Sequence, residues 1–215
     1  MDEKEIIKKA AQYFSAKIAE FGDSPKGVDW NSVDSQVIRL AQVMKVIKEK
    51  QSFSVNDLGC GNGQLIETLR NDFFSNFRYV GSDISKEMIE LATLKYKGDK
   101  QIEFIHIQNV SDIPICDYTL ASGIFNMKLS INIKDWEKYI FNTILTINSK
   151  SIKGFSFNML TSYSDKEKMR DDLYYADPSA VFDFCKNNCS KNISLLHDYD
   201  LYDFTLIVRK LKSFA

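Results

Sequence analysis

The chain has 215 residues, 44% of them hydrophobic, and its 28 basic and 29 acidic side chains leave a net charge of −1. This balance gives no electrostatic indication of nucleic-acid binding, and no run of 18 apolar residues predicts a membrane span. The charged start of the chain is unlike a secretory signal peptide. Four scattered cysteines favour reduced thiols in the cytoplasm, and only two histidines argue against a metal site.

Two helices are predicted before residue 50, and we interpret 1–50 as an N-terminal helical cap. Apolar residues spaced three and four apart predict an amphipathic helix over 3–21. Glycine and proline in 22–31 end that helix, and Ser32 is a candidate N-cap for the next one.

Strands alternate with helices from residue 53 onward. Strands are predicted at 53–58, 77–84, 101–107, 117–124, 152–160, 193–200 and 202–210, and helices at 63–73, 86–97, 134–148 and 178–188. Only a short turn separates the last two strands, so they should pair antiparallel. The pattern predicts an α/β fold over 51–215: a doubly wound, mostly parallel seven-stranded sheet with helices on both faces and a C-terminal antiparallel strand.

Two features fall where parallel strands end, which is where ligands bind in such sheets. Gly59, Gly61 and Gly63 follow the first strand, and glycine lets main-chain N–H groups come close to a ligand. Asp83 ends the second strand, where a carboxylate can accept hydrogen bonds from both hydroxyls of a ribose. The alternative is that Asp83 merely precedes Ser85, the predicted cap of the next helix.

The glycine loop departs from the dinucleotide fingerprint G-x-G-x-x-G/A. Counted from Gly59, the last position of that fingerprint is Gln64. Asp57, just before the loop, would be badly placed beside a pyrophosphate and well placed beside an ammonium group. A nicotinamide-dependent oxidoreductase therefore remains an alternative that Gln64 disfavours.

Four stretches resemble the class I S-adenosylmethionine-dependent methyltransferases. "NDLGCGNG" resembles the first motif of the family, "VGSDIS" the second, "SKEMIELA" the following helix and "QNVSDIPICDY" a third motif. In the third motif Asn109 replaces the usual Asp, which keeps a hydrogen-bond acceptor but drops a charge. The resemblance covers about 53–148, and the closing hairpin by topology. It implies a Rossmann-like fold, S-adenosylmethionine as cofactor, and methyl transfer by in-line displacement.

The resemblance also implies a set of cofactor contacts. They are Asp57 and the backbone of Gly59, Cys60, Gly61 and Gly63 at the methionine part, Ser122 and Gly123 near the sulfonium, Asp83 at the ribose, and Ile84, Met88, Asn109 and Val110 at the adenine. For Met88, a plain core position on its helix is the alternative. Arg39 could meet the cofactor carboxylate, but a solvated helix face is the reading that we favour for it.

The methyl acceptor is less clearly marked. The family's Asp/Asn-Pro-Pro-Tyr/Phe signature is absent after the fourth strand, where "ASGIFNMKL" stands, and this disfavours nucleobase amines. We expect a small-molecule acceptor and transfer to oxygen. A similarity to small bacterial enzymes of that kind names sugars or precursors of surface polysaccharides as one class. The alternatives are a catalytically silent S-adenosylmethionine-binding partner subunit and a methyltransferase acting on RNA or protein.

Candidate acceptor contacts come from three regions. They are Trp30 before the core, Asn126 after the fourth strand, and Tyr163, Tyr174 and Tyr175 in an insert at about 160–178. A core anchor is the alternative for Trp30, and an ordinary polar loop residue for Asn126. His197 is a candidate general base, because its ordinary pKa is near neutral, although a structural histidine is favoured.

Overall fold

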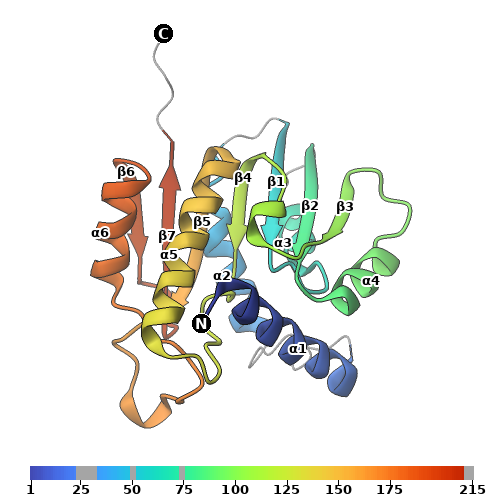
Figure 1. The fold of residues 1–215 in the computed structure, drawn as a ribbon. Helices are drawn as coiled ribbons and strands as arrows, with labels where there is room; N and C mark the ends of the chain where they lie inside the picture. Colours follow the sequence, from blue (N-terminus) through green and yellow to red (C-terminus); the bar gives the residue numbers. More distant parts are fainter. Residues whose placement is uncertain (23–32, 49–51, 73–75, 211–215) are drawn as a thin grey trace.

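A computed structural model describes residues 1–22, 33–48, 52–72 and 76–210 (Figure 1). Within these residues seven strands form one sheet in the order β3-β2-β1-β4-β5-β7-β6. The strands are β1 Phe53–Leu58, β2 Phe77–Asp83, β3 Ile102–His106, β4 Cys116–Ala121, β5 Ser151–Leu160, β6 Asn192–Leu196 and β7 Asp203–Arg209. The helices are α1 Glu3–Phe21, α2 Val33–Met44, α3 Gln64–Asn71, α4 Lys86–Lys95, α5 Ile133–Lys150 and α6 Pro178–Asn188, with 3-10 turns η1 Val110–Asp112 and η2 Lys166–Lys168.

The strand directions confirm the predicted topology. The strands β1 to β5 pair in parallel, and β7 runs antiparallel to both β5 and β6. In the register of the sheet, Leu58 of β1 lies opposite Ser82 of β2 and Ala121 of β4. The carboxyl ends of these three strands are therefore level, and the segments that follow them meet at one edge of the sheet.

Helices cover both faces, as predicted. The helices α5 and α6 pack on one face, in front of the sheet in Figure 1, and α2 and α3 pack on the other. Side chains alternate between the two faces along β5 and β7. Phe155, Phe157 and Leu206 pack in the core under α5 and α6, and Ile207 packs in the core under α2 and α3. Both faces of β5 and β7 are therefore buried over most of the length of each strand.

The helix α1 matches the predicted range 3–21 and lies across the carboxyl edge of the sheet (Figure 1). Its N-cap Asp2 accepts a hydrogen bond from the N–H of Glu5 at 2.8 Å. It packs beside α4, where the Ser15 hydroxyl donates to Glu87 at 2.6 Å. The predicted cap Ser32 lies outside the described residues. None of the helices in the described ranges combines the length and apolarity that crossing a bilayer requires.

Two predicted strands end three or four residues earlier than expected. The strand β4 ends at Ala121 instead of 124, because Gly123 adopts a φ of 80° and its N–H bonds to the Asn158 side chain instead of a strand. The strand β6 ends at Leu196, so His197 lies in the turn that follows it. Ser85 caps α4 as predicted, accepting from the N–H of Met88 at 3.3 Å.

Candidate cofactor-binding site

A cavity of about 220 Å³ lies at the carboxyl edge of the sheet, where the ends of β1, β2 and β4 meet. Its walls come from the glycine loop and the end of β2, from α1 and α2, and from the β4–α5 loop together with the segment after β5. Lining residues used below are Ala10, Phe14, Arg39, Asp57, Gly59, Cys60, Gly61, Asp83, Ile84, Met88, Val110, Ser122, Gly123, Ile124, Asn126, Trp136, Tyr139, Arg170 and Leu173.

The glycine loop has a backbone that only glycine adopts easily. Gly59, Gly61 and Gly63 have φ values of 75°, 52° and 79°. A Cβ on Gly59 would also lie 2.3 Å from Cγ2 of Ile124, another residue that lines the cavity. The loop therefore brings bare main chain to the cavity wall, as the sequence predicts. Gly63 itself caps α3 and does not line the cavity.

Asp83 is fixed at the end of β2 by main-chain donors. Its Oδ2 accepts from the N–H of Gly61 at 2.9 Å, and its Oδ1 accepts from the N–H of Ser85 at 2.8 Å. Burial raises the pKa of this carboxyl, while both main-chain hydrogen bonds oppose the rise. A carboxylate has about four acceptor positions, so two bonds leave it able to accept from a ligand.

Asp57 lies inside the cavity wall and is bonded to Tyr79. The Tyr79 hydroxyl donates to Oδ2 of Asp57 at 2.7 Å. The pKa of Asp57 is raised to about 7, because burial and, to a smaller extent, the charge of Asp83 outweigh the lowering effect of the Tyr79 hydrogen bond. The sequence did not predict a role for Tyr79, because only the sheet register places it diagonally across from Asp57. A ligand cation here would stabilise the ionised carboxylate.

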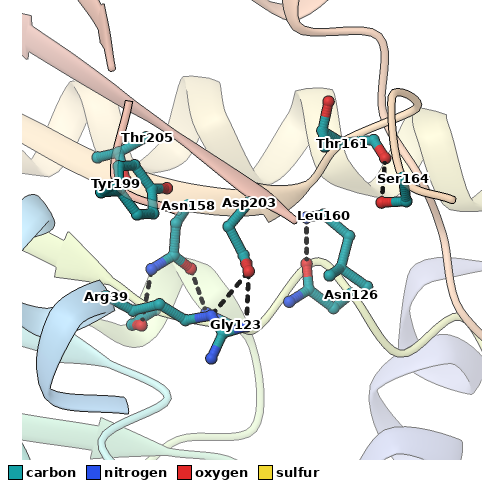
Figure 2. A network of polar contacts seen from close by, with 11 residues as sticks. Arg39, Gly123, Asn126, Asn158, Leu160, Thr161, Ser164, Tyr199, Asp203 and Thr205 are labelled. Carbon is teal, nitrogen blue, oxygen red and sulfur yellow. Dashed lines mark hydrogen bonds and ion pairs between the residues drawn. The ribbon is translucent and has the colours of Figure 1, made fainter. Parts of the chain in front are cut away.

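Arg39 does not lie on a solvated face, which corrects the favoured sequence reading. Its side chain lines the cavity, and the residue is only 8% exposed. Its Nε and Nη2 donate to Oδ2 of Asp203, the first residue of β7, at 2.8 and 2.6 Å (Figure 2). The partner is 164 residues away, so no local pattern could reveal this pairing.

Two side-chain amides, that of the buried Asn158 and that of Asn126, hold the loop after β4. The Asn158 Oδ1 accepts from the N–H of Gly123 at 2.8 Å, and its Nδ2 donates to the hydroxyl of Ser122 at 2.9 Å. Asn126 lies on the same loop, and its Oδ1 accepts from the N–H of Leu160 at 3.0 Å (Figure 2). Asn158 was missed because a lone amide inside an apolar strand carries no sequence signal of its own.

Several candidate residues do not line this cavity. Asn109 is half-buried on a neighbouring groove, where its N–H donates to Asp112 at 2.9 Å. His197 is exposed, with its ring beside that of Tyr163, which is 72% exposed. Trp30 lies outside the described residues.

The other two tyrosines of the insert are bonded within their own surroundings. The Tyr174 hydroxyl donates to Glu137 at 2.9 Å, and the Tyr175 hydroxyl accepts from the N–H of Arg170 at 3.0 Å. The insert reaches the cavity through other residues, Arg170 and Leu173. Across the described parts of the chain, no group of three or more Asp, Glu, His or Cys side chains is arranged to hold a metal ion.

Comparison with known proteins fits this geometry. A family model described as "Methyltransferase domain" matches residues 55–144. A curated protein of Mycobacterium tuberculosis, "Putative methyltransferase Rv1506c", is 47% identical over 167 residues, which cover 78% of this chain and 99% of that protein.

Solved structures show the same fold. Magnesium protoporphyrin IX methyltransferase (ChlM) from Synechocystis PCC 6803, with bound SAH, aligns with a TM-score of 0.65 at 14% identity, over 95% of this chain and 99% of that one. The N-methyltransferase NodS from Bradyrhizobium japonicum WM9, in complex with S-adenosyl-L-homocysteine, aligns with a TM-score of 0.62 at 12% identity, over 94% and 98%. The matching family model and the curated relative, together with the glycine loop and the acid that ends β2, show that the chain belongs to the class I S-adenosylmethionine-dependent methyltransferases.

Proposed function

We propose that this methyltransferase acts on an oxygen atom of a small molecule. The observation that carries the proposal is the covering of the cavity on two sides: Ala10 and Phe14 of α1 line it, as do Arg170 and Leu173 of the insert. A covered cavity suits a small acceptor better than a folded RNA or protein. The near-neutral charge of the chain also gives nucleic acid no electrostatic attraction.

The residues that line the cavity fit S-adenosylmethionine. The buried Asp57 would face the ammonium of the methionine part, and Asp83 would accept from the ribose hydroxyls. Ile84, Met88 and Val110 offer an apolar surface for the adenine. Asn109 is left out of this arrangement, because it lies on the neighbouring groove.

The chemistry asks the protein mainly for alignment. S-adenosylmethionine, when bound, supplies a methyl group activated by the sulfonium. The chain must hold the acceptor in line with that methyl and exclude water, and good orientation alone can lower a barrier by about 7–11 kcal/mol. Ser122 and Gly123, held by Asn158, would lie next to the reacting atoms. His197 has no part in this proposal, since it does not line the cavity.

The acceptor would contact the β4–α5 loop, α5 and the insert. Because Oδ1 of Asn126 is bonded to Leu160, its Nδ2 is the end that remains to donate to an acceptor. Trp136 and Tyr139 of α5 add aromatic rings to this wall. Amide donors beside aromatic rings suit a sugar, so sugars and sugar-linked precursors of surface polysaccharides are the acceptor class to test first. The four free cysteines favour a cytoplasmic location for the enzyme.

Two experiments test the proposal. In a thermal-shift assay, S-adenosylhomocysteine should raise the unfolding temperature and NAD should not, because a ligand that binds only the folded state stabilises it. Incubation with methyl-labelled cofactor and a metabolite panel should then label a small molecule. Label only in RNA or protein fractions would overturn the acceptor class. Cofactor binding without turnover, together with a stable complex with another protein, would favour a silent partner subunit.

A further inference from the structure

We propose that Arg39 binds the carboxylate of the cofactor's methionine part, and that Asp203 is the residue that positions Arg39 for this contact. The inference rests on the cofactor placement proposed above and deepens it. That placement gives the ammonium of the methionine part to Asp57 but assigns no partner to the carboxylate. A carboxylate in a covered cavity needs a cation or several hydrogen-bond donors, because burying it unpaired is costly.

Two cationic side chains line the cavity within the described ranges, Arg39 and Arg170. Arg170 belongs to the insert on the acceptor side, where its Nε and Nη2 donate to the two oxygens of Asp172 at 3.0 and 2.5 Å. Arg39 belongs to α2, which packs against α3, the helix that begins directly after the glycine loop. Arg39 is therefore the cation on the side where the methionine part would lie.

The geometry of the Arg39–Asp203 pair differs from that of a stabilising ion pair. Both Arg39 nitrogens donate to the same oxygen, Oδ2, instead of forming two parallel bonds to the two oxygens (Figure 2). Asp203 is 0% exposed, yet its Oδ1 has no hydrogen-bond partner within the described residues. A buried charge pair left half-satisfied costs free energy and is weak evidence for a stabilising role.

The two members of the pair also differ in access to the cavity. Arg39 lines the cavity, whereas Asp203 lies behind it on β7 and is fully buried. Asp203 can therefore fix the plane of the guanidinium without touching a ligand. A guanidinium held in this way presents its donors in one orientation, as two-point recognition of a carboxylate requires.

Calorimetry with two ligands tests the proposal. The ligands are S-adenosylhomocysteine and its decarboxylated analogue, 5′-deoxy-5′-(3-aminopropylthio)adenosine, which keeps the ammonium and the adenosine. For Arg39→Gln we expect S-adenosylhomocysteine to bind about 10- to 100-fold more weakly, the range of a lost charge-assisted contact. The analogue should bind within about threefold of the wild-type value, because it has no carboxylate to lose.

Asp203 is tested by a pair of variants. Asp203→Ala should lower the affinity for S-adenosylhomocysteine by about tenfold, because the guanidinium loses its fixed orientation. The affinity for the decarboxylated analogue should not fall with it. Asp203→Asn keeps an oxygen that can accept from Arg39, so it should restore most of the discrimination between the two ligands.

Arg209→Gln is the matched control. Arg209 also joins β7 to the end of α2, donating to the main-chain oxygens of Lys45 and Val46, but it does not line the cavity. The control should leave the affinity ratio of the two ligands unchanged. If Arg39→Gln unfolds, Arg39→Lys keeps the charge and should retain part of the discrimination.

Several outcomes would overturn the proposal. If Arg39→Gln loses affinity for both ligands equally, the Arg39–Asp203 pair is only a structural connection between α2 and β7. If it loses affinity for neither ligand, Arg39 is not part of the site. If the affinity ratio of the two ligands is the same in Asp203→Ala as in the Arg209→Gln control, Asp203 does not position Arg39. If the wild-type protein binds neither ligand, the cofactor placement itself fails, which separates that failure from a failure of Arg39 alone.

Discussion

The main-chain N–H of Gly61 donates to Oδ2 of Asp83 at 2.9 Å, so the glycine loop is bonded directly to the carboxylate that ends β2. The loop and the acid lie 22 residues apart in the sequence and belong to successive strand–helix units. Because one hydrogen bond joins them, a change at either residue should disturb both parts of the proposed cofactor site.

Replacement of Asp83 should weaken the binding of S-adenosylhomocysteine, the product that the cofactor leaves. In Asp83→Asn, the amide NH2 group would have to face the N–H of Gly61 or of Ser85, so that two donors would meet. Loss of a charge-assisted contact to the ribose adds to this, and a total of about 2 kcal/mol corresponds to a roughly 30-fold weaker affinity for S-adenosylhomocysteine. Isothermal titration calorimetry measures the change.

Asp117→Asn is the control for that variant. Asp117 accepts from the N–H of Ser54 at 2.8 Å, so it makes a similar main-chain contact at the opposite edge of the sheet. We expect no change in cofactor affinity there. Equal affinities for the wild type and Asp83→Asn would show that Asp83 only supports the loop.

Gly59→Ala should destabilise the protein more than Gly98→Ala. Both glycines have positive φ, 75° and 92°, so each alanine costs about 1–2 kcal/mol of backbone strain. Only the Cβ at position 59 would meet another group, Cγ2 of Ile124 at 2.3 Å, which adds about 1–3 kcal/mol for overpacking. Denaturant unfolding compares the two variants. Equal losses would mean that Ile124 moves aside at no cost.

Cofactor affinity should depend on pH through Asp57. With a pKa of about 7, its carboxyl is mostly neutral at pH 5.5 and mostly ionised at pH 8. If the ionised form binds the ammonium, affinity for S-adenosylhomocysteine should rise about 30-fold between these pH values, in proportion to the ionised fraction. In Asp57→Asn the affinity for S-adenosylhomocysteine should be lower and should depend less on pH. A wild-type profile as flat as that of the variant would remove Asp57 from the ammonium site.

The same group should make the ligand-free protein less stable at higher pH. The pKa of Asp57 in the folded state, about 7, lies above its ordinary value of 3.8. Between these values the folded state holds a proton that the unfolded chain releases, so the contribution of Asp57 to stability falls as the pH rises from about 4 to 7. The difference in unfolding free energy between wild type and Asp57→Asn, measured at pH 5 and pH 8, isolates this term. A difference that is constant with pH would contradict it.

Cys189 should be the first cysteine to react with iodoacetamide under native conditions. A hydrogen bond from the Cys185 thiol and the charge of Lys210 lower the pKa of Cys189. Cys60, Cys116 and Cys185 are buried, and burial contributes to raising the pKa of each thiol. Peptide mass spectrometry after short exposures identifies the modified residue. Lys210→Gln should slow the reaction, and faster labelling of Cys60 would contradict the assignment.

The sequence by itself determined the strands and helices, the glycine loop and the acid that ends β2. These features depend on neighbours close in the chain. Apolar periodicity marks an element, glycine permits the positive φ at Gly59, and Ser85 caps α4 through the N–H of a residue three positions on. The level ends of parallel strands then brought Gly61, Asp83 and Ser122 to one cavity without further information.

Only the tertiary structure decided which polar side chains are buried and what they touch. The sequence favours a solvated Arg39 because its partner, Asp203, is 164 residues away, and nothing in the sequence marks Tyr79 before the sheet register brings it to Asp57. Asn158 acquires its role from a loop 35 residues earlier, whereas Tyr174 and Tyr175 are turned to other partners by the path of the insert. A polar side chain can be buried wherever the fold supplies its hydrogen-bond partner, and that partner is set by long-range packing, which no local pattern records.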